Sequence, residues 1–172
     1  MSNEDMFDVN SYVVYPSHGV GKIIEIETQN IAGSEIIVYN ISFINDNMVL
    51  SIPVKRQKKV GLRNLITITE VEDVYNILSR KPQISKGMWS RRAQDYLGKI
   101  NSGDIFASAE VVRDLFKKNF ETSYSERMIY ESAFERLVHE ISIVKNVEYE
   151  QVNSEIEAIV QNKVLKINEE AA

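Results

Sequence analysis

The sequence predicts an α+β protein of two domains, a small antiparallel β domain at residues 1–66 and an all-α domain at residues 67–172. Two observations lead to this prediction. Short runs rich in β-branched and aromatic residues, separated by turn residues, occupy the chain up to about residue 66. From Thr67 onward, apolar residues recur with the period of an amphipathic helix. Because a parallel sheet would need crossover helices, we expect a strongly bent antiparallel sheet or barrel.

The β domain is expected to contain four or five short strands. Pro16 ends the first strand, and the two glycines of Pro16–Gly21 supply a turn. Ala32-Gly33 reverses the chain between the second and third strands, and Asn45–Asn47 forms a polar turn before the fourth. The expected strands cover residues 11–15, 22–30, 35–44, 48–52 and 62–66.

The helical domain is expected to begin with a short helix. Thr69-Glu-Val-Glu72 fits a capping box at its start, and Pro82 ends it. Residues 81–87 then form a linker to a second helix that starts near Trp89.

Three more helices are expected after the one at Trp89. Ser102-Gly103-Asp104 stops that helix and starts another at residues 105–120. A second capping box, Ser123–Glu126, opens a long helix, and a final amphipathic helix is expected at residues 150–167. The domain therefore has four or five helices in all.

Composition narrows the class of protein. The chain has 172 residues, of which 44% are hydrophobic and 26% charged, with no cysteine. Disulfides, thiolate metal sites and a cysteine nucleophile are excluded, and a reducing, cytoplasmic location is expected. The acidic N-terminus has no apolar run, and no uncharged stretch is long enough to span a bilayer. Since the net charge is −5, any nucleic-acid role must be local or assisted by a partner.

A basic island surrounds the only tryptophan, Trp89. From Arg80 to Lys118 there are nine basic and four acidic residues. A basic island with an aromatic residue in an acidic protein indicates a site that faces a polyanion. Helical periodicity offers an alternative, with Trp89 at the top of a buried stripe, Arg91 on the far side and Arg92 and Lys99 flanking the stripe. The other stripe residues are Ala93, Tyr96, Leu97 and Ile100.

No catalytic centre is apparent, so we expect no enzyme activity, no metal and no cofactor. His18 and His139 are far apart and have no spaced His or Cys partners. Ser17 and Ser90 lack the context of an activated nucleophile. The basic run Lys55–Lys59, with Arg63, fits either phosphate contact or a solvated loop.

Several motifs in order resemble the CarD family of bacterial transcription regulators. They are Tyr12–Gly21, Ile52-Pro-Val54 with Val60–Arg63, Trp89-Ser-Arg-Arg92 with Ser102–Asp104, and Glu110–Leu115. The likeness extends from about Phe7 to Val144.

The resemblance implies a Tudor-like, SH3-like N-terminal barrel that binds the β subunit of RNA polymerase and is shared with the transcription-repair coupling factor. It also implies a helical domain that contacts promoter DNA, with Trp89 as a wedge in the minor groove at the upstream edge of the melted bubble. Lys86, Arg91 and Arg92 are then expected beside the DNA backbone. The wedge stabilises the open complex, and the protein is expected to be a cytoplasmic monomer, associated with the nucleoid through the polymerase, without membrane or small-molecule partners.

Two departures from the family pattern concern binding. Gln29 and Ser51 stand at polymerase-binding positions where some relatives carry arginines, so docking is expected to use backbone pairing along a strand edge and other side chains. Gln94 replaces a further basic residue of some relatives, which removes one phosphate contact.

Two other functions remain open from sequence. Tyr12, Tyr15, Tyr39 and Phe43 could line an aromatic cage for a methylated cation, as in a Tudor-type peptide reader. The interpretation that we favour is that they are alternating core and surface residues of a small barrel. Alternatively the helical domain of a polymerase-bound adaptor could recruit a protein instead of DNA, because residues 121–172 carry eleven acidic and five basic residues.

Overall fold

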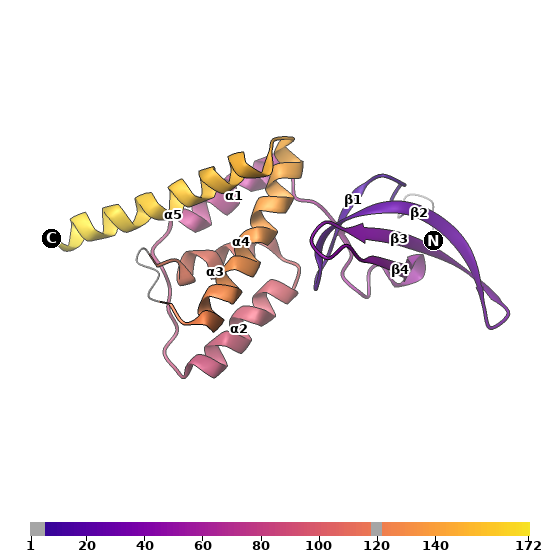
Figure 1. Cartoon of the computed structure of the whole chain (residues 1–172), viewed down its shortest axis with the longest axis horizontal. Coiled ribbons are helices and arrows are strands. Elements are labelled where there is room, and N and C mark those ends of the chain that lie inside the picture. The colour runs from indigo at the N-terminus through magenta and orange to yellow at the C-terminus, as the bar shows by residue number, and fades with distance from the viewer. Residues whose placement is uncertain (1–5, 118–121) are drawn as a thin grey trace. The chain divides into compact units, whose positions relative to one another are not determined.

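The computed structural model describes residues 6–117 and 122–172 (Figure 1). The chain divides into two compact units, Met1–Leu65 and Ile66–Ala172. An antiparallel five-stranded sheet makes up the first unit, and five helices make up the second. The expected α+β class is confirmed. The expected linker, residues 81–87, lies inside the second unit between its first two helices.

Each of the five strands pairs antiparallel with its neighbours in the order β4-β3-β2-β1-β5, so β4 and β5 are the two edges of the sheet. β2 is longer than the sequence indicated because it begins directly after the Pro16 turn, and β5 is shorter than expected. The strands are β1 Tyr12–Tyr15, β2 Gly19–Ile31, β3 Ser34–Phe43, β4 Val49–Pro53 and β5 Arg63–Asn64.

The long β2–β3 hairpin turns at Ala32 and Gly33, both of which have positive φ angles of 50° and 80°. Two successive residues with positive φ are typical of the tight turn that matches the twist of a hairpin. Gly21, further down the same hairpin, has no room for a side chain. A Cβ there would lie 2.5 Å from Cγ2 of Ile41.

The core of the first unit is one apolar cluster between the strands and the 3-10 helix η2, Val54–Arg56. Tyr39 lies at its centre and is completely buried. Its hydroxyl donates to Oε1 of Gln57 (2.9 Å) and accepts from the backbone N–H of Phe7 (3.0 Å). These bonds satisfy a polar group that would be costly to bury alone. The buried cluster contains Val13, Ile23, Tyr39, Ile41, Phe43, Ile52, Val54 and Leu62.

The helical unit buries its apolar stripes against a common core. α3 packs against α1, α2 and α4, and α5 packs against α1 and α4. In Figure 1 the yellow α5 accordingly runs beside α1. The bounds are α1 Ile68–Ser79, α2 Trp89–Asn101, α3 Ile105–Leu115, α4 Tyr124–Lys145 and α5 Tyr149–Ala171.

Side-chain caps fix several helix starts. The expected capping box at Thr69 is wrong by two residues: Thr67 is the N-cap and forms a reciprocal pair with Glu70. The sequence Thr67-Ile-Thr-Glu70 has the same pattern two residues earlier, so the pattern alone could not distinguish the two positions. Ser123 caps α4 as expected, by accepting from the backbone N–H of Glu126 (3.2 Å).

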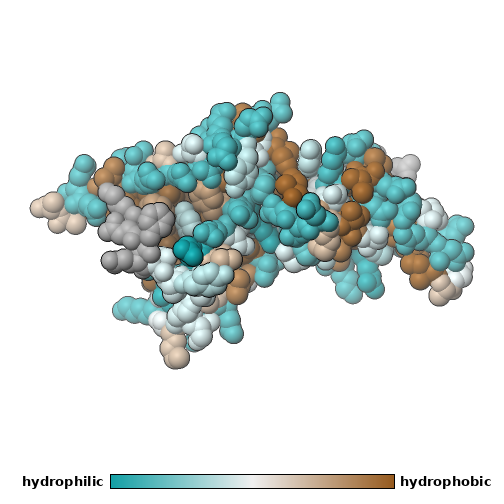
Figure 2. Space-filling model, in the orientation of Figure 1, coloured by the Kyte–Doolittle hydropathy of each residue, from teal (hydrophilic) through white to brown (hydrophobic). Residues whose placement is uncertain are grey.

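The third helix ends earlier than the sequence indicated. α3 stops at Leu115, not at residue 120, and residues 118–121 lie outside the described residues. Among the described residues, no helix is both long and apolar enough to cross a membrane. On the face drawn in Figure 2, hydrophilic residues predominate and hydrophobic ones gather only in small patches.

Candidate nucleic-acid interface at the start of helix α2

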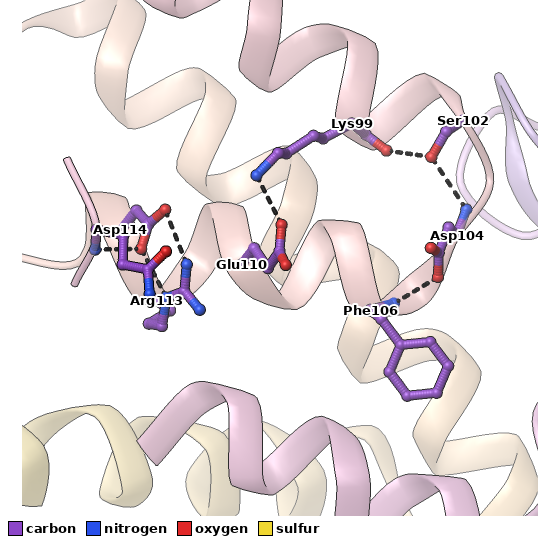
Figure 3. Close-up of polar contacts among 8 residues, drawn as sticks. Lys99, Ser102, Asp104, Phe106, Glu110, Arg113 and Asp114 are labelled. Carbon is purple, nitrogen blue, oxygen red and sulfur yellow. Dashed lines mark hydrogen bonds and ion pairs between the residues drawn. The ribbon is translucent and has the colours of Figure 1, made fainter. Parts of the chain in front are cut away.

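The segment leading into α2 is held by a buried ion pair at the end of α3. Asp114 accepts from Nε of its neighbour Arg113 (2.7 Å) and from the backbone N–H of Gln83 (2.9 Å). Both charged side chains are buried. Because a buried carboxylate needs compensation, the arginine and the amide together make this arrangement possible. The path of the chain before Trp89 therefore depends on α3 (Figure 3).

A buried lysine from α5 joins the same cluster. Nζ of Lys163 donates to the backbone carbonyl of Arg113 (3.0 Å). Burial lowers the pKa of Lys163 to about 8, because the charged form loses hydration there, and the nearby carboxylate of Asp114 only partly offsets this. Residues from the connector, α3 and α5 thus meet in one polar cluster within the helical core.

The corner between α2 and α3 is fixed by a second set of bonds, drawn in Figure 3. Nζ of Lys99 on α2 donates to Glu110 on α3 over 2.6 Å. At the turn, the hydroxyl of Ser102 donates to the carbonyl of Lys99 and accepts from the N–H of Asp104. Asp104 then caps α3 by accepting from the N–H of Phe106 (2.9 Å). α2 consequently has a defined direction relative to α3.

Trp89 is the first residue of α2 and is partly exposed. One side of the indole packs against the helical core, where its ring centroid lies 6.4 Å from that of Tyr96. Nε1 donates to the hydroxyl of Ser125 in the first turn of α4 (3.3 Å). The indole is thus neither wholly enclosed nor free. It combines a fixed orientation with an accessible edge, as a contact residue requires.

The expected stripe on α2 is correct except for Leu97. Tyr96 and Ile100 are buried, and Ala93 packs against the core, but Leu97 is 44% exposed. α2 packs mainly against α3 and α4, so only a narrow strip of its surface is covered. Leu97 lies just outside that strip.

Trp89 is surrounded by exposed apolar and basic side chains. Met88, the residue before it, is 78% exposed. Lys86 and Arg91 are exposed, and Arg92 is half-buried. Within residues 6–117 and 122–172, none of these three basic side chains forms an ion pair.

Four other basic residues of the island are neutralised by pairing, whereas Arg80, at the end of α1, forms no ion pair among the described residues. Lys81 pairs with Glu170, Lys99 with Glu110, Arg113 with Asp114 and Lys117 with Glu126. Lys118 lies outside the described residues. The uncompensated positive charge beside Trp89 therefore comes from Lys86, Arg91 and Arg92.

Arg92 differs from Arg91 in its surroundings. Its guanidinium carbon lies 5.5 Å from the ring centroid of Trp89 and 5.9 Å from that of Tyr96. Nε of Arg92 and the hydroxyl of Tyr96 are both inaccessible, and neither has a hydrogen-bond partner in the described part of the chain. The sequence had placed Arg92 beside the stripe, but its packing on two rings was not visible there.

Gln29 and Ser51 lie on the strands that flank β3. Gln29 is paired with Ile36 and Ser51 with Asn40, four residues apart on β3, so both side chains project from one face of the sheet. The hydroxyl of Ser51 donates to Oδ1 of Asn40 (2.6 Å). The side-chain amide of Gln29 donates to Glu27, and hydrogen bonds from Gln29 and then Asn40 lower the pKa of Glu27. The polar side chains named on this face are thus amides, a hydroxyl and a carboxylate, without an arginine.

The backbone of Ser51 points to the open edge of the sheet. The N–H of Phe43 donates to the carbonyl of Met48, and hydrogen-bonded pairs alternate along an antiparallel ladder. Leu50 is therefore bonded to β3, whereas Val49 and Ser51 direct their backbone groups away from it. β4 is an edge strand, so these groups are available for a further strand.

The aromatic residues of the β unit do not form an open cage. Tyr39 is fully buried and Phe43 is 2% exposed, while Tyr12 lies beside the amino group of Lys22 at 5.7 Å. A cage for a methylated cation needs several accessible ring faces. The aromatic-cage hypothesis is therefore wrong for these residues.

The two histidines and the basic run Lys55–Lys59 were the remaining candidates for a functional site. Nδ1 of His18 lies 3.3 Å from Oδ2 of Asp46, and the imidazole ring packs on Tyr15. Burial lowers the pKa of His139 on α4. Among the described residues, no group of three or more His, Asp or Glu side chains could hold a metal ion. In the run Lys55–Lys59 the lysines are exposed, but Gln57 is buried.

Comparison with known proteins matches both parts of the chain. The family domain described as "CarD-like/TRCF RID domain" matches residues 7–66, and "CarD, C-terminal domain" matches residues 73–157. The chain is also 29% identical over 151 residues to "Putative transcription factor YdeB" of Bacillus subtilis (strain 168), which covers 87% of this chain and 99% of that relative. Fold and matches together define a transcription factor with an RNA polymerase-interacting domain. The chain belongs to the CarD family.

Proposed function

We propose that this protein regulates transcription initiation by stabilising the promoter open complex. Residues 1–66 bind the β subunit of RNA polymerase, and residues 67–172 contact promoter DNA. Trp89 inserts into the minor groove at the upstream edge of the bubble. The observation that carries the proposal is the partly exposed indole at the start of α2, beside three basic side chains that have no ion pair among the described residues.

The charges at this site favour assisted binding. Lys86, Arg91 and Arg92 correspond to at most three phosphate contacts, which give weak, salt-sensitive binding with a Kd of roughly 10⁻⁴ to 10⁻⁶ M. Inserting an apolar side chain between stacked bases costs about a few kcal/mol in intact duplex. That cost is smaller at a bubble edge, where base pairing already ends. Met88, exposed beside Trp89, enlarges the apolar tip that enters this gap.

Tethering makes so weak a contact effective. When the β unit is bound to polymerase, the helical unit is held near the DNA at a local concentration on the order of millimolar. We propose that the polymerase segment pairs with the open edge of β4 as an added strand, using the outward backbone groups of Val49 and Ser51. Gln29 then contributes through its side-chain amide, since this chain has no arginine there.

Trp89→Ala tests the wedge directly. We expect binding to the isolated β subunit to be unchanged and the lifetime of heparin-resistant open complexes on a weak promoter to fall roughly 5- to 150-fold, since an aromatic–base stack contributes ~1–3 kcal/mol. Leu97→Ala, which removes another exposed apolar side chain from α2, is the matched control. Equal lifetimes for wild type and Trp89→Ala would contradict the wedge.

A polymerase-bound adaptor without DNA contact is the second candidate. The acidic excess after residue 120 favours it, because these helices would repel DNA. A photo-crosslinker at position 89 in a promoter complex distinguishes the two functions. Crosslinks to promoter DNA support the wedge, and crosslinks to protein alone support the adaptor.

A further inference from the structure

We infer that Arg92 acts through Trp89 and not as a phosphate contact: its guanidinium holds the indole in the orientation that DNA meets. The inference rests on the proposed function, and it separates the roles of two adjacent arginines. Arg91 is exposed and acts on the DNA backbone, whereas Arg92 is half-buried and acts as a positioning residue.

The helix brings Arg92 onto the ring face of Trp89. Residues three and seven positions after Trp89 share its side of α2, which places Arg92 between the indole and Tyr96. The guanidinium carbon is 5.5 Å from one ring centroid and 5.9 Å from the other. A cation at this distance from an indole face is attracted by the ring, and a planar guanidinium can also stack on it.

Burial of Nε argues against a side-on bidentate phosphate contact. Nε of Arg92 has no accessible surface and no hydrogen-bond partner in the described residues. An arginine that binds a phosphate side-on uses Nε together with a terminal nitrogen, and that edge of Arg92 is closed. The nearby hydroxyl of Tyr96 is closed off in the same way. The two rings, not an anion, are what this guanidinium touches.

The indole is held from a second direction as well. Its Nε1 donates to Ser125 on α4, so α2 supplies the arginine and α4 supplies the acceptor. A side chain ordered before binding loses less conformational entropy when it inserts. Removing the guanidinium leaves the hydrogen bond to Ser125 and the packing of one side of the ring on the core as its restraints.

The first experiment measures the ring without DNA. Trp89 is the only tryptophan, so its emission reports on this site alone. In the full-length protein we expect Arg92→Gln to shift the emission to longer wavelength and to increase quenching by acrylamide. Arg92→Lys, which keeps the charge but not the planar stack, should stay close to Arg92→Gln. Arg91→Gln is the matched control and should resemble wild type.

The second experiment measures salt dependence on DNA. Full-length protein is titrated onto a fluorescein-labelled duplex with a preformed bubble, at several salt concentrations, by anisotropy. Losing one phosphate contact reduces the slope of log K against log salt by about 0.9, which we expect for Arg91→Gln. Arg92→Gln should weaken binding by roughly 2- to 30-fold with the slope of wild type.

Each outcome decides a separate point. A reduced slope for Arg92→Gln, full rescue by Arg92→Lys, or emission equal to wild type would overturn the positioning role. If Arg92→Gln does not fold, as judged by circular dichroism, the emission and slope of Arg92→Lys decide. If Trp89→Ala and Arg91→Gln both bind the bubble like wild type, the proposed function fails, while the emission result still tests the packing of Arg92.

Discussion

The carboxylate of Asp114 accepts a hydrogen bond from the backbone N–H of Gln83 over 2.9 Å, although 31 residues separate them in sequence. The bond ties the connector between α1 and α2 to the end of α3. Because the same carboxylate neutralises the buried guanidinium of Arg113, one side chain links the stability of the helical core to the segment that presents Trp89.

Asp114→Asn is expected to lower the free energy of unfolding by ~3–5 kcal/mol. The amide keeps an acceptor for Gln83 but leaves the buried charge of Arg113 uncompensated. Urea unfolding followed by circular dichroism measures the change. Asp95→Asn is the control, because Asp95 is exposed on α2 and its loss changes the net charge equally. A difference below about 0.5 kcal/mol would show that the ion pair does not stabilise the fold.

The lowered pKa of Lys163 predicts that the free energy of unfolding rises with pH from about 8 upward. Its pKa is about 8 in the folded protein and near 10.4 when unfolded, so in this window the unfolded chain binds more protons. Below pH 8 the lysine is charged in both the folded and the unfolded protein. The folded protein then bears the full free-energy cost of burying the charged amino group beside Arg113 and Asp114. Raising the pH from 7.5 to 9.5 should therefore stabilise the protein.

Lys163→Met isolates that effect. Between pH 7.5 and 9.5 the variant should lose the rise seen in wild type, measured as the free energy of unfolding in urea. Lys166→Met, an exposed lysine of the same helix, should keep it. The window ends at pH 9.5 because burial raises the pKa values of Tyr75 and Tyr130, which reverses the dependence at higher pH. Parallel curves for wild type and Lys163→Met would contradict the assignment.

Ser51→Pro should weaken binding to the polymerase β subunit without unfolding the β unit. Proline removes one outward N–H of β4 and none of the bonds to β3, and edge strands accept proline. We expect a loss of roughly tenfold or more in affinity, measured by biolayer interferometry, on the scale of ~1.4 kcal/mol for a hydrogen bond. Ser51→Ala removes the bond to Asn40 but keeps the N–H, so its affinity should equal that of wild type. Equal affinity for the proline variant would exclude pairing at this edge.

Local patterns predicted most elements because each depends on neighbouring residues. The turn at Ala32-Gly33, the N-cap of α4 at Ser123 and the start of α3 at Asp104 could all be predicted, since each needs a particular residue type at one position. The capping box predicted at Thr69 was wrong because two overlapping patterns fit the sequence, and in the structure the N-cap is Thr67.

The candidate site was predictable only in part. The sole tryptophan and the basic residues near it were visible as a cluster of types. The sequence did not reveal which basic side chains stay unpaired, because the partners of Lys81 and Lys99 lie 89 and 11 residues away. Leu97 could not be excluded from the core either, since a helical period does not reveal how many neighbours a helix has.

By itself the sequence determined that a β domain precedes a helical one and that a lone indole stands among positive charges. These features follow from periodicity and composition, which act over a few residues. Only the tertiary structure decided that Ser125 and Arg92 hold that indole, that Asp114 holds the connector, and that the backbone of Ser51 is directed outward. Those relationships depend on contacts between helices and on ladder alternation, and packing between distant segments is not written in any local pattern.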